Sequence, residues 1–418
     1  MQIEEIVLGI CRKARQAARV LSTTSTSARN DALQLAAQGL RGRGAEVIEA
    51  NRQDVSAGKN AGLSPALLDR LTLTEARLSG VAEGLEQIAA LPDPLGETIS
   101  SWRRPNGLAI SQVRIPLGVV GIIYESRPNV TADAAGLCLK SGNAVILKGG
   151  SEAFKTNTAI ARIISAAVGE AGLPTHAVQL LPTTDRQAVT VLLGQRDFID
   201  VIVPRGGPSL IAAITESSKI PVIQHYAGIC HVYVDSQADL KMGEEIAFNA
   251  KVQRPGVCNA METLLVHEQI ADEFLPLAGK RLQGAGVELR GCERTRAVLS
   301  GISPATDEDW RTEYLDLILS IKVVGSLDEA IDFINAWGTG HSDAIVTDSY
   351  ASAQRFLAAV DSSAVYVNAS TRFTDGYEFG FGAEVGISTN RLHARGPMGL
   401  RELTTYKYVI LGNGQIRE

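Results

Sequence analysis

Apolar positions near the start of the chain recur at the three- to four-residue spacing of one helix face. Residues 6–18 carry one apolar stripe of this kind, and residues 33–40 carry another. Two prolines at 92 and 94 interrupt the pattern, because proline breaks the hydrogen bonding of a helix. We therefore expect helices from residue 3 to about residue 92, with a packing role and no chemistry of their own.

From Gly118 onward, short apolar runs alternate with helical segments. The runs predicted as strands are 119–123, 144–147, 178–181 and 198–203, then 231–235, 263–266, 287–289, 318–324, 344–346 and 364–367. Strands that are apolar throughout are typical of parallel sheets covered by helices on both faces. The alternation restarts after Gly228, which predicts two Rossmann-like α/β domains, with any nucleotide bound at the carboxyl ends of the strands.

A different period appears at residues 99–115, where two β-like runs flank Asn106-Gly107. This dipeptide is a strong signal for a two-residue hairpin turn. The β-like tail at 404–411 could add a strand beside the hairpin. Because an isolated hairpin is barely stable in water, docking on a second subunit is one hypothesis for what covers it.

Composition and charge narrow the class of protein. The net charge of −6 offers no basic face for nucleic acid, and no apolar run is long enough to span a membrane. The five cysteines stand at positions 11, 138, 230, 258 and 292. Their odd number and wide spacing argue against disulfides and against a metal site, and favour a reducing compartment. We predict a soluble cytoplasmic protein without a metal ion.

Cys258 has the most suggestive local sequence. It directly follows the Pro255-Gly256 turn and stands just before the apolar run 261–266. A tight loop of this kind can aim backbone N–H groups at a thiolate and at the group it attacks. A small buried thiol is an equally good interpretation of this stretch taken alone.

Two junctions between a strand and a helix are rich in glycine. Lys148, ahead of two glycines and Ser151, suits an anionic ligand such as a nucleotide, although an ordinary turn with an exposed lysine fits as well. Ser151 supplies no carboxylate for ribose hydroxyls, which favours NADP over NAD. The second junction contains Gly206, Gly207, Pro208 and Ser209, but it lacks the G-x-G-x-x-G fingerprint.

Asn129 follows another predicted strand. It could be a helix N-cap, or it could donate its side-chain N–H to a developing oxyanion. Neither His225 nor His341 has a partner at a spacing that predicts a metal site or a catalytic triad.

Four stretches together resemble the aldehyde dehydrogenase superfamily, and the similarity runs from about residue 5 to the C-terminus. They are residues 125–131, 147–152, 257–263 and, most specifically, 324–345. The last stretch resembles the signature of one reductase branch of the superfamily. The resemblance implies an aldehyde dehydrogenase-like α/β fold with Cys258 as nucleophile, Asn129 as oxyanion donor, Lys148 on the cofactor ribose and Glu313 on the nicotinamide ribose.

The resemblance also implies three parts. These are a cofactor-binding domain (1–98 and 116–228), a catalytic domain (229–400), and a β-flap (99–115 and 401–418) that pairs between subunits of a homo-oligomer, a dimer or a tetramer. Oxidising members have a glutamate that activates water where this chain has His225. The absence of that base fits a reductase, which must keep water off its acyl-enzyme.

The implied activity is NADPH-dependent reduction of L-glutamyl 5-phosphate to L-glutamate 5-semialdehyde through a Cys258 thioester, in proline biosynthesis. Its phosphate needs a cationic pocket, for which Arg127 and Arg254 are the candidates. The labile substrate implies coupling to the glutamate kinase that makes it. The alternatives are a coenzyme A-dependent acylating relative or a non-catalytic NADP-binding one. The groups that hold the substrate's α-amino and α-carboxylate, the subunit number and the roles of His225 and His341 stay open.

Overall fold

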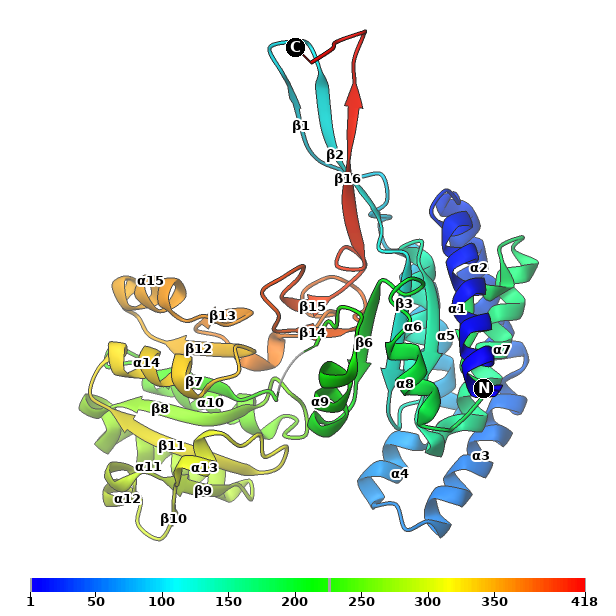
Figure 1. Cartoon of the computed structure of the whole chain (residues 1–418). Coiled ribbons are helices and arrows are strands. Elements are labelled where there is room, and N and C mark those ends of the chain that lie inside the picture. Colours follow the sequence, from blue (N-terminus) through cyan, green and yellow to red (C-terminus); the bar gives the residue numbers. More distant parts are fainter. Residues whose placement is uncertain (1, 225–226, 418) are drawn as a thin grey trace. The chain divides into compact units, whose positions relative to one another are not determined.

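The computed structural model describes residues 2–224 and 227–417, and His225 therefore lies outside the described residues (Figure 1). Two compact units make up the chain, and each is treated by itself below. The first unit comprises Met1–Gln224, Gly380–Gly386 and Met398–Glu418, and the second comprises His225–Phe379 and Ile387–Pro397.

The first unit begins with the predicted helices. They are α1 (Gln2–Leu21), α2 (Thr26–Gly42), α3 (Gly44–Asn60), α4 (Pro65–Leu71) and α5 (Glu75–Ala90). Local sequence explains several of their starts. Ser64 accepts a hydrogen bond from the Leu67 N–H with Pro65 at the first helical position, and Thr74 caps α5 in the same way through the Arg77 N–H.

A parallel four-stranded sheet forms the centre of the first unit, with the order β5-β4-β3-β6. Its strands are β3 (Val119–Tyr124), β4 (Ala144–Lys148), β5 (Val178–Leu180) and β6 (Val201–Arg205). The connecting helices are α6 (Asn129–Lys140), η1 (Ser151–Ala153), α7 (Phe154–Glu170), η2 (Thr175–Ala177), α8 (Gln187–Leu193) and α9 (Pro208–Ser217). Ile123 on β3 pairs with Lys148, and Tyr124 pairs with Arg205, so the carboxyl ends of three neighbouring strands meet at one edge.

The second unit contains a seven-stranded parallel sheet in the order β10-β9-β11-β8-β7-β12-β13. The strands are β7 (Cys230–Val234), β8 (Met261–His267), β9 (Glu288–Gly291), β10 (Ser303–Pro304), β11 (Ile318–Val324), β12 (Ser342–Val346) and β13 (Ala364–Val367). The helices are α10 (Leu240–Val252), α11 (Glu268–Gly284), α12 (Glu293–Val298), α13 (Asp307–Trp310), α14 (Leu327–Trp337), α15 (Tyr350–Ala359) and η3 (Thr371–Phe373).

Alternate residues of these buried strands pack in two separate apolar clusters. Val232 and Val234 pack in one cluster with Phe274 of α11, whereas Tyr233 packs in the other with Phe356 of α15. Successive side chains of a strand point to opposite faces, so both faces of the sheet are covered. The two parallel sheets confirm the predicted α/β class.

An antiparallel sheet of three strands completes the first unit. It has the order β1-β2-β16, from β1 (Thr98–Arg103), β2 (Ala109–Pro116) and β16 (Thr404–Leu411). Gly107 adopts a φ of 89° at the hairpin turn, a conformation that favours glycine. The three strands project as an arm from the first unit in Figure 1. A further pair, β14 (Gly386–Ser388) and β15 (Gly396–Met398), forms a two-stranded sheet. Which part binds cofactor and which part catalyses stays a prediction.

Candidate active site

Cys258 lies in the turn that joins α10 to β8, and its side chain is half-buried. The Ala260 N–H donates to the Val257 carbonyl at 3.1 Å and closes the turn. Gly228 packs directly on this backbone, since a Cβ at that position would lie 1.9 Å from the Cys258 carbonyl oxygen. Only glycine fits there, and the tight approach fixes where the Cys258 backbone can lie.

The five thiols differ in exposure. Cys11, Cys138 and Cys230 are buried, and burial raises the pKa of each, to about 12 for Cys11. Cys292 is half-buried like Cys258. Burial alone would raise the Cys292 pKa, but hydrogen bonds to the sulfur lower it overall. Because the thiolate is the reactive form, the buried thiols are poor candidates for a nucleophile.

A buried polar network reaches the Cys258 backbone and contains His341. Cys230 Sγ donates to the Cys258 carbonyl at 3.2 Å and lies 3.7 Å from His341 Nδ1. The same His341 nitrogen is 2.9 Å from Ser342 Oγ, which lies 2.6 Å from Thr374 Oγ1. The signature histidine therefore belongs to the support of the Cys258 loop.

A buried ion pair connects the two ends of that loop. Lys251 on the last turn of α10 bonds Glu262 on β8 at 2.5 Å, and both side chains are fully buried. Burial lowers the pKa of Lys251 and raises that of Glu262. Glu262 also accepts the Leu315 N–H at 3.3 Å. This interaction ties the Cys258 loop to the segment that follows Glu313, whose backbone turns at Leu315 with a φ of 53°.

Glu313 is half-buried near the same loop. Burial raises its pKa, and a hydrogen bond from the Gly228 backbone opposes that shift. Gly228 therefore contacts both the Glu313 carboxylate and the Cys258 backbone. The structure brings Glu313 and Cys258 together although 55 positions separate them in the chain.

Sequence patterns missed Arg372, which lies on η3. Its Nε donates to Gln253 Oε1 at 2.9 Å, and its Nη1 donates to Asn259 Oδ1. Gln253 and Asn259 stand on either side of Cys258 in the loop, and the predicted Arg254 is exposed in the same loop. No local signal could find Arg372, because 113 positions separate it from Asn259.

Lys148 lies at the edge of the first unit's sheet. Its side chain is buried, with Nζ donating to the Gly149 carbonyl at 2.8 Å, so the exposed-turn interpretation is wrong. Ser151 is exposed beside it. The next residue, Glu152, accepts the Ser126 N–H at 2.7 Å and the Ser126 hydroxyl at 2.5 Å. Burial lowers the pKa of Lys148, and the negative charge of Glu152 opposes that shift. This turn therefore does carry a carboxylate, at position 152 and not at Ser151, the position considered for binding ribose hydroxyls.

The second glycine junction leads into α9. Its N-terminal Gly207 N–H donates to Glu125 Oε2 at 2.8 Å, and a Cβ at Gly206 would lie 2.5 Å from the same oxygen. Pro208 and Ser209 begin the helix. A helix N-terminus favours an anion, and here a carboxylate of the chain itself holds that position. The glycines at both junctions allow side chains of the chain itself to pack closely, since a Cβ at Gly149 would lie 2.1 Å from Asn157 and one at Gly206 would lie 2.5 Å from Glu125.

Asn129 is the first residue of α6, and Pro128 holds the N-cap position without a side-chain cap bond. The N-cap interpretation is therefore wrong. Asn129 Nδ2 instead donates to Asp133 Oδ2 at 2.9 Å. An amide nitrogen carries two hydrogens, so this bond orients the amide and leaves one hydrogen for another acceptor. Burial raises the pKa of Asp133 to about 6. Arg127 is exposed in the loop just before α6.

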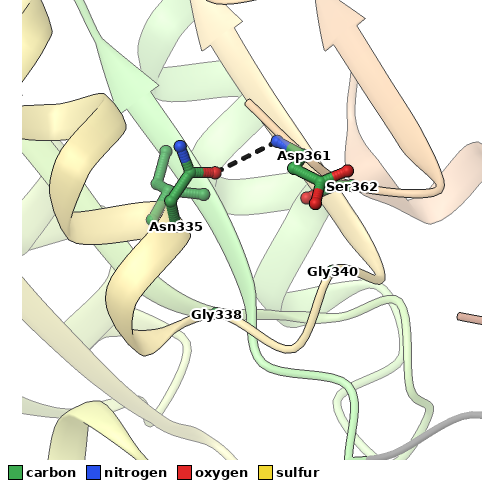
Figure 2. Close-up of a pocket in the computed structure, with 6 residues that line it drawn as sticks. Asn335, Gly338, Gly340, Asp361 and Ser362 are labelled. Carbon is green, nitrogen blue, oxygen red and sulfur yellow. Dashed lines mark hydrogen bonds between the residues drawn. The ribbon is translucent and has the colours of Figure 1, made fainter. Parts of the chain in front are cut away.

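A pocket of about 280 Å³ lies at the end of α14, within the signature stretch (Figure 2). It is lined by Ile334, Asn335, Gly338, Gly340, Asp361 and Ser362. Its polar groups bond one another, since the Asp361 N–H donates to Asn335 Oδ1 at 3.0 Å. No predicted site residue lines it.

Within residues 2–224 and 227–417, no group of three or more histidine, cysteine, aspartate or glutamate side chains could hold a metal ion. No helix in the described part of the chain is long and apolar enough to cross a membrane.

Known proteins resemble this chain over its whole length. The aldehyde dehydrogenase family profile matches residues 4–298 and 295–409. A gamma-glutamyl phosphate reductase from Moorella thermoacetica is 60% identical over 407 residues, which cover 97% of both chains. The protein of that name from Halothermothrix orenii is 58% identical over 418 residues and covers 100% of both.

A solved structure agrees. The crystal structure of gamma-glutamyl phosphate reductase from Thermotoga maritima superposes with a TM-score of 0.97 at 49% identity, covering 99% of this chain and 100% of that one. The chain belongs to the aldehyde dehydrogenase family and groups within it with the gamma-glutamyl phosphate reductases.

Proposed function

We propose that this chain reduces L-glutamyl 5-phosphate to L-glutamate 5-semialdehyde and phosphate, in proline biosynthesis. The observation that carries the proposal is the half-buried Cys258 on its tight turn, in a chain 60% identical to a protein named for this reaction. The substrate is an acyl phosphate, in which phosphate is already a good leaving group. The chain therefore has to supply a nucleophile, stabilise an oxyanion and exclude water.

Cys258 is the proposed nucleophile. Its thiolate attacks the acyl carbon, the carbon–sulfur bond forms, and phosphate leaves with the electron pair of the carbon–oxygen bond. A reduced nicotinamide cofactor, when bound, supplies the hydride that converts the resulting thioester to the level of the aldehyde. Collapse of the thiohemiacetal then releases the semialdehyde and restores the thiolate. The rigid packing of Gly228 on the Cys258 backbone supports a fixed position for the sulfur.

The oxyanion is held by the Cys258 backbone N–H and by the side chain of Asn129. The bond to Asp133 supports this role, because it fixes the rotation of the amide before substrate arrives. Asp133 acts through Asn129 and is a positioning residue.

Lys148, Ser151, Gly206, Gly207, Pro208, Ser209 and Glu313 are the proposed cofactor ligands. NADP(H) is preferred because position 151 is a serine, and because Glu152 already accepts two hydrogen bonds from Ser126. Titration of the protein with NADPH and with NADH, followed by nucleotide fluorescence, tests the preference. Equal affinity for the two nucleotides would contradict it.

The sheet β1-β2-β16 is the proposed contact with a second copy of the chain. Its exposed side chains include large apolar ones, among them Trp102 at 42% exposure, Tyr408 at 55% and Ile410 at 56%. Its outer strands β1 and β16 each present an edge. Sedimentation velocity should find a dimer or tetramer, and a monomer at micromolar concentration would contradict this proposal.

The activity is tested most simply in reverse. Steady reduction of NADP by the semialdehyde should require inorganic phosphate, since phosphate must attack the thioester to release the acyl group before the next turnover. Activity with coenzyme A in place of phosphate would identify the acylating alternative. Binding of NADPH without turnover under any of these conditions would identify a non-catalytic relative.

Asn129→Ala should lower kcat about 100-fold, the usual effect of removing one oxyanion donor. The free energy of unfolding should change little, because Asn129 does not cap α6. Asn335→Ala is the matched control, since it removes another hydrogen-bonded amide from a helix and should leave kcat unchanged. Loss of stability with unchanged kcat would show that Asn129 is only structural.

A further inference from the structure

Two arginines in the second unit lie near the Cys258 thiol. Arg254 stands four residues before Cys258 in the loop, and Arg372 is placed against the same loop by η3. Burial lowers the pKa of Arg372, the positive charge of Arg254 lowers it further, and Cys258 and Asp375 oppose the shift. The two guanidinium groups are therefore close enough to repel each other, and an anion between them would relieve that repulsion.

Arg372 is held in a fixed orientation by neutral groups on both sides of Cys258. Gln253 accepts from its Nε at 2.9 Å, and Asn259 accepts from Nη1. Asn259 is buried, and its own amide donates to the carbonyls of Arg372 at 3.3 Å and of Thr374 at 2.9 Å. Amide oxygens orient a guanidinium without cancelling its charge. These contacts hold the positively charged Arg372 guanidinium in a fixed orientation beside the proposed nucleophile.

Asp375 is an acidic neighbour of Arg372, and its negative charge raises the pKa of that arginine. Its carboxylate faces its own loop, where Oδ1 accepts the Tyr377 N–H at 2.9 Å. The Asp375 carboxylate is therefore held by its own loop and does not serve as the anionic partner of the Arg372 guanidinium.

We propose that Arg372, together with Arg254, binds the phosphoryl group of the acyl phosphate and then the departing phosphate. The inference rests on the proposed function. An acyl phosphate joins its phosphorus through one oxygen to the carbon that Cys258 attacks, so the phosphoryl group must lie beside the sulfur. The substrate α-carboxylate lies at the far end of the glutamyl chain. A planar guanidinium also matches phosphate oxygens through paired N–H donors, which an ammonium cannot do.

This site acts on the first chemical step. As the carbon–sulfur bond forms, the carbon–oxygen bond to phosphate breaks and negative charge grows on the leaving oxygen. A guanidinium fixed at that place stabilises the growing charge without having to move. In reverse, it holds phosphate for attack on the thioester.

The test uses the reverse reaction with Arg372→Lys and Arg372→Met. Both variants should raise the KM for phosphate, by about 10- to 100-fold for a lost charge-assisted hydrogen bond, with a larger effect in Arg372→Met. The KM for the semialdehyde should stay within about twofold. Arg355→Lys, which changes an exposed arginine paired with Asp328, is the matched control and should change neither KM.

Three results separate the explanations. An unchanged KM for phosphate in active variants overturns the assignment. A rise in the KM for the semialdehyde alone also overturns it, and assigns Arg372 to the α-carboxylate. A wild-type enzyme without phosphate-dependent NADP reduction means that the proposed function fails, whatever the variants do.

A binding measurement covers variants that turn over too slowly. In a Cys292→Ala background, which removes the other half-buried thiol, inorganic phosphate should slow the alkylation of Cys258 by iodoacetamide. Arg372→Lys should abolish this protection at the phosphate concentration that protects the parent. Equal protection in both proteins would contradict the inference.

Discussion

Cys258→Ser is expected to abolish phosphate-dependent reduction of NADP by the semialdehyde, with a loss of at least about four orders of magnitude in kcat. A serine hydroxyl is far less acidic than a thiol, and no base assigned to this site would activate it. The loop should keep its shape, because serine is nearly isosteric and the contacts with Gly228 and Cys230 are made by the Cys258 backbone. Binding of NADPH, measured by its fluorescence, should therefore be unchanged.

Cys292→Ala is the control for that result. Cys292 is the other half-buried thiol and has a lowered pKa, so it is the thiol most able to act in place of Cys258. It lies at the start of α12, where its sulfur bonds Thr295 Oγ1 at 3.2 Å and accepts the Val323 N–H at 3.5 Å. Its replacement should leave kcat near the wild-type value. Near-normal turnover of Cys258→Ser would remove the basis of the proposed mechanism.

Lys251→Met is expected to cost about 3–5 kcal/mol of folding free energy, because it leaves the buried Glu262 carboxylate without its counterion. Glu262 then has to be buried as a lone charge or take up a proton. Its burial already raises its pKa, and a buried acid with a raised pKa favours the folded state at low pH and loses that contribution as pH rises. The deficit of the variant, measured by urea unfolding, should thus be larger at pH 8 than at pH 6.

The double variant Lys251→Met, Glu262→Leu is the control. Replacing both members of a buried ion pair by apolar groups of similar volume is often neutral for stability. The double variant should therefore recover most of the loss. Its kcat should still be reduced. The double variant lacks the ion pair that joins the two ends of the Cys258 loop, and it lacks the Glu262 carboxylate that accepts the Leu315 N–H after Glu313. A single variant as stable as the wild type at both pH values would contradict the buried geometry.

Local patterns were enough to predict the architecture. A strand such as β3 consists of apolar residues that are all buried, and recognising this pattern needs no knowledge of distant residues. The hairpin at Asn106-Gly107 was predictable from the dipeptide, but the predicted two-residue turn was wrong: the Arg104 N–H donates to the Leu108 carbonyl at 2.8 Å, so Pro105, Asn106 and Gly107 form a three-residue turn.

Contacts between distant segments were not predictable in this way. Arg372 follows the end of β13 and belongs to no recognisable motif. It contacts the Cys258 loop only because the fold brings β8 and β13 into one sheet. Lys251 and Glu262 look in sequence like a helix end and a strand start, and nothing local indicates that both are buried. The proximity of Glu313 to the Cys258 loop was expected only from family resemblance. The N-cap hypothesis for Asn129 failed because the helix begins one residue earlier than its polar residue indicates.

The central claim is that Cys258 forms a glutamyl thioester that reacts with hydride or with phosphate but is not hydrolysed by water. Semialdehyde and NADP mixed with the enzyme in the absence of phosphate test it directly, with NADPH followed by stopped flow and the protein by intact mass. The account predicts a burst of one NADPH per subunit, an added acyl group on Cys258, and steady turnover once phosphate is added. Steady NADPH formation without phosphate, or a burst that leaves Cys258 unmodified, would contradict it.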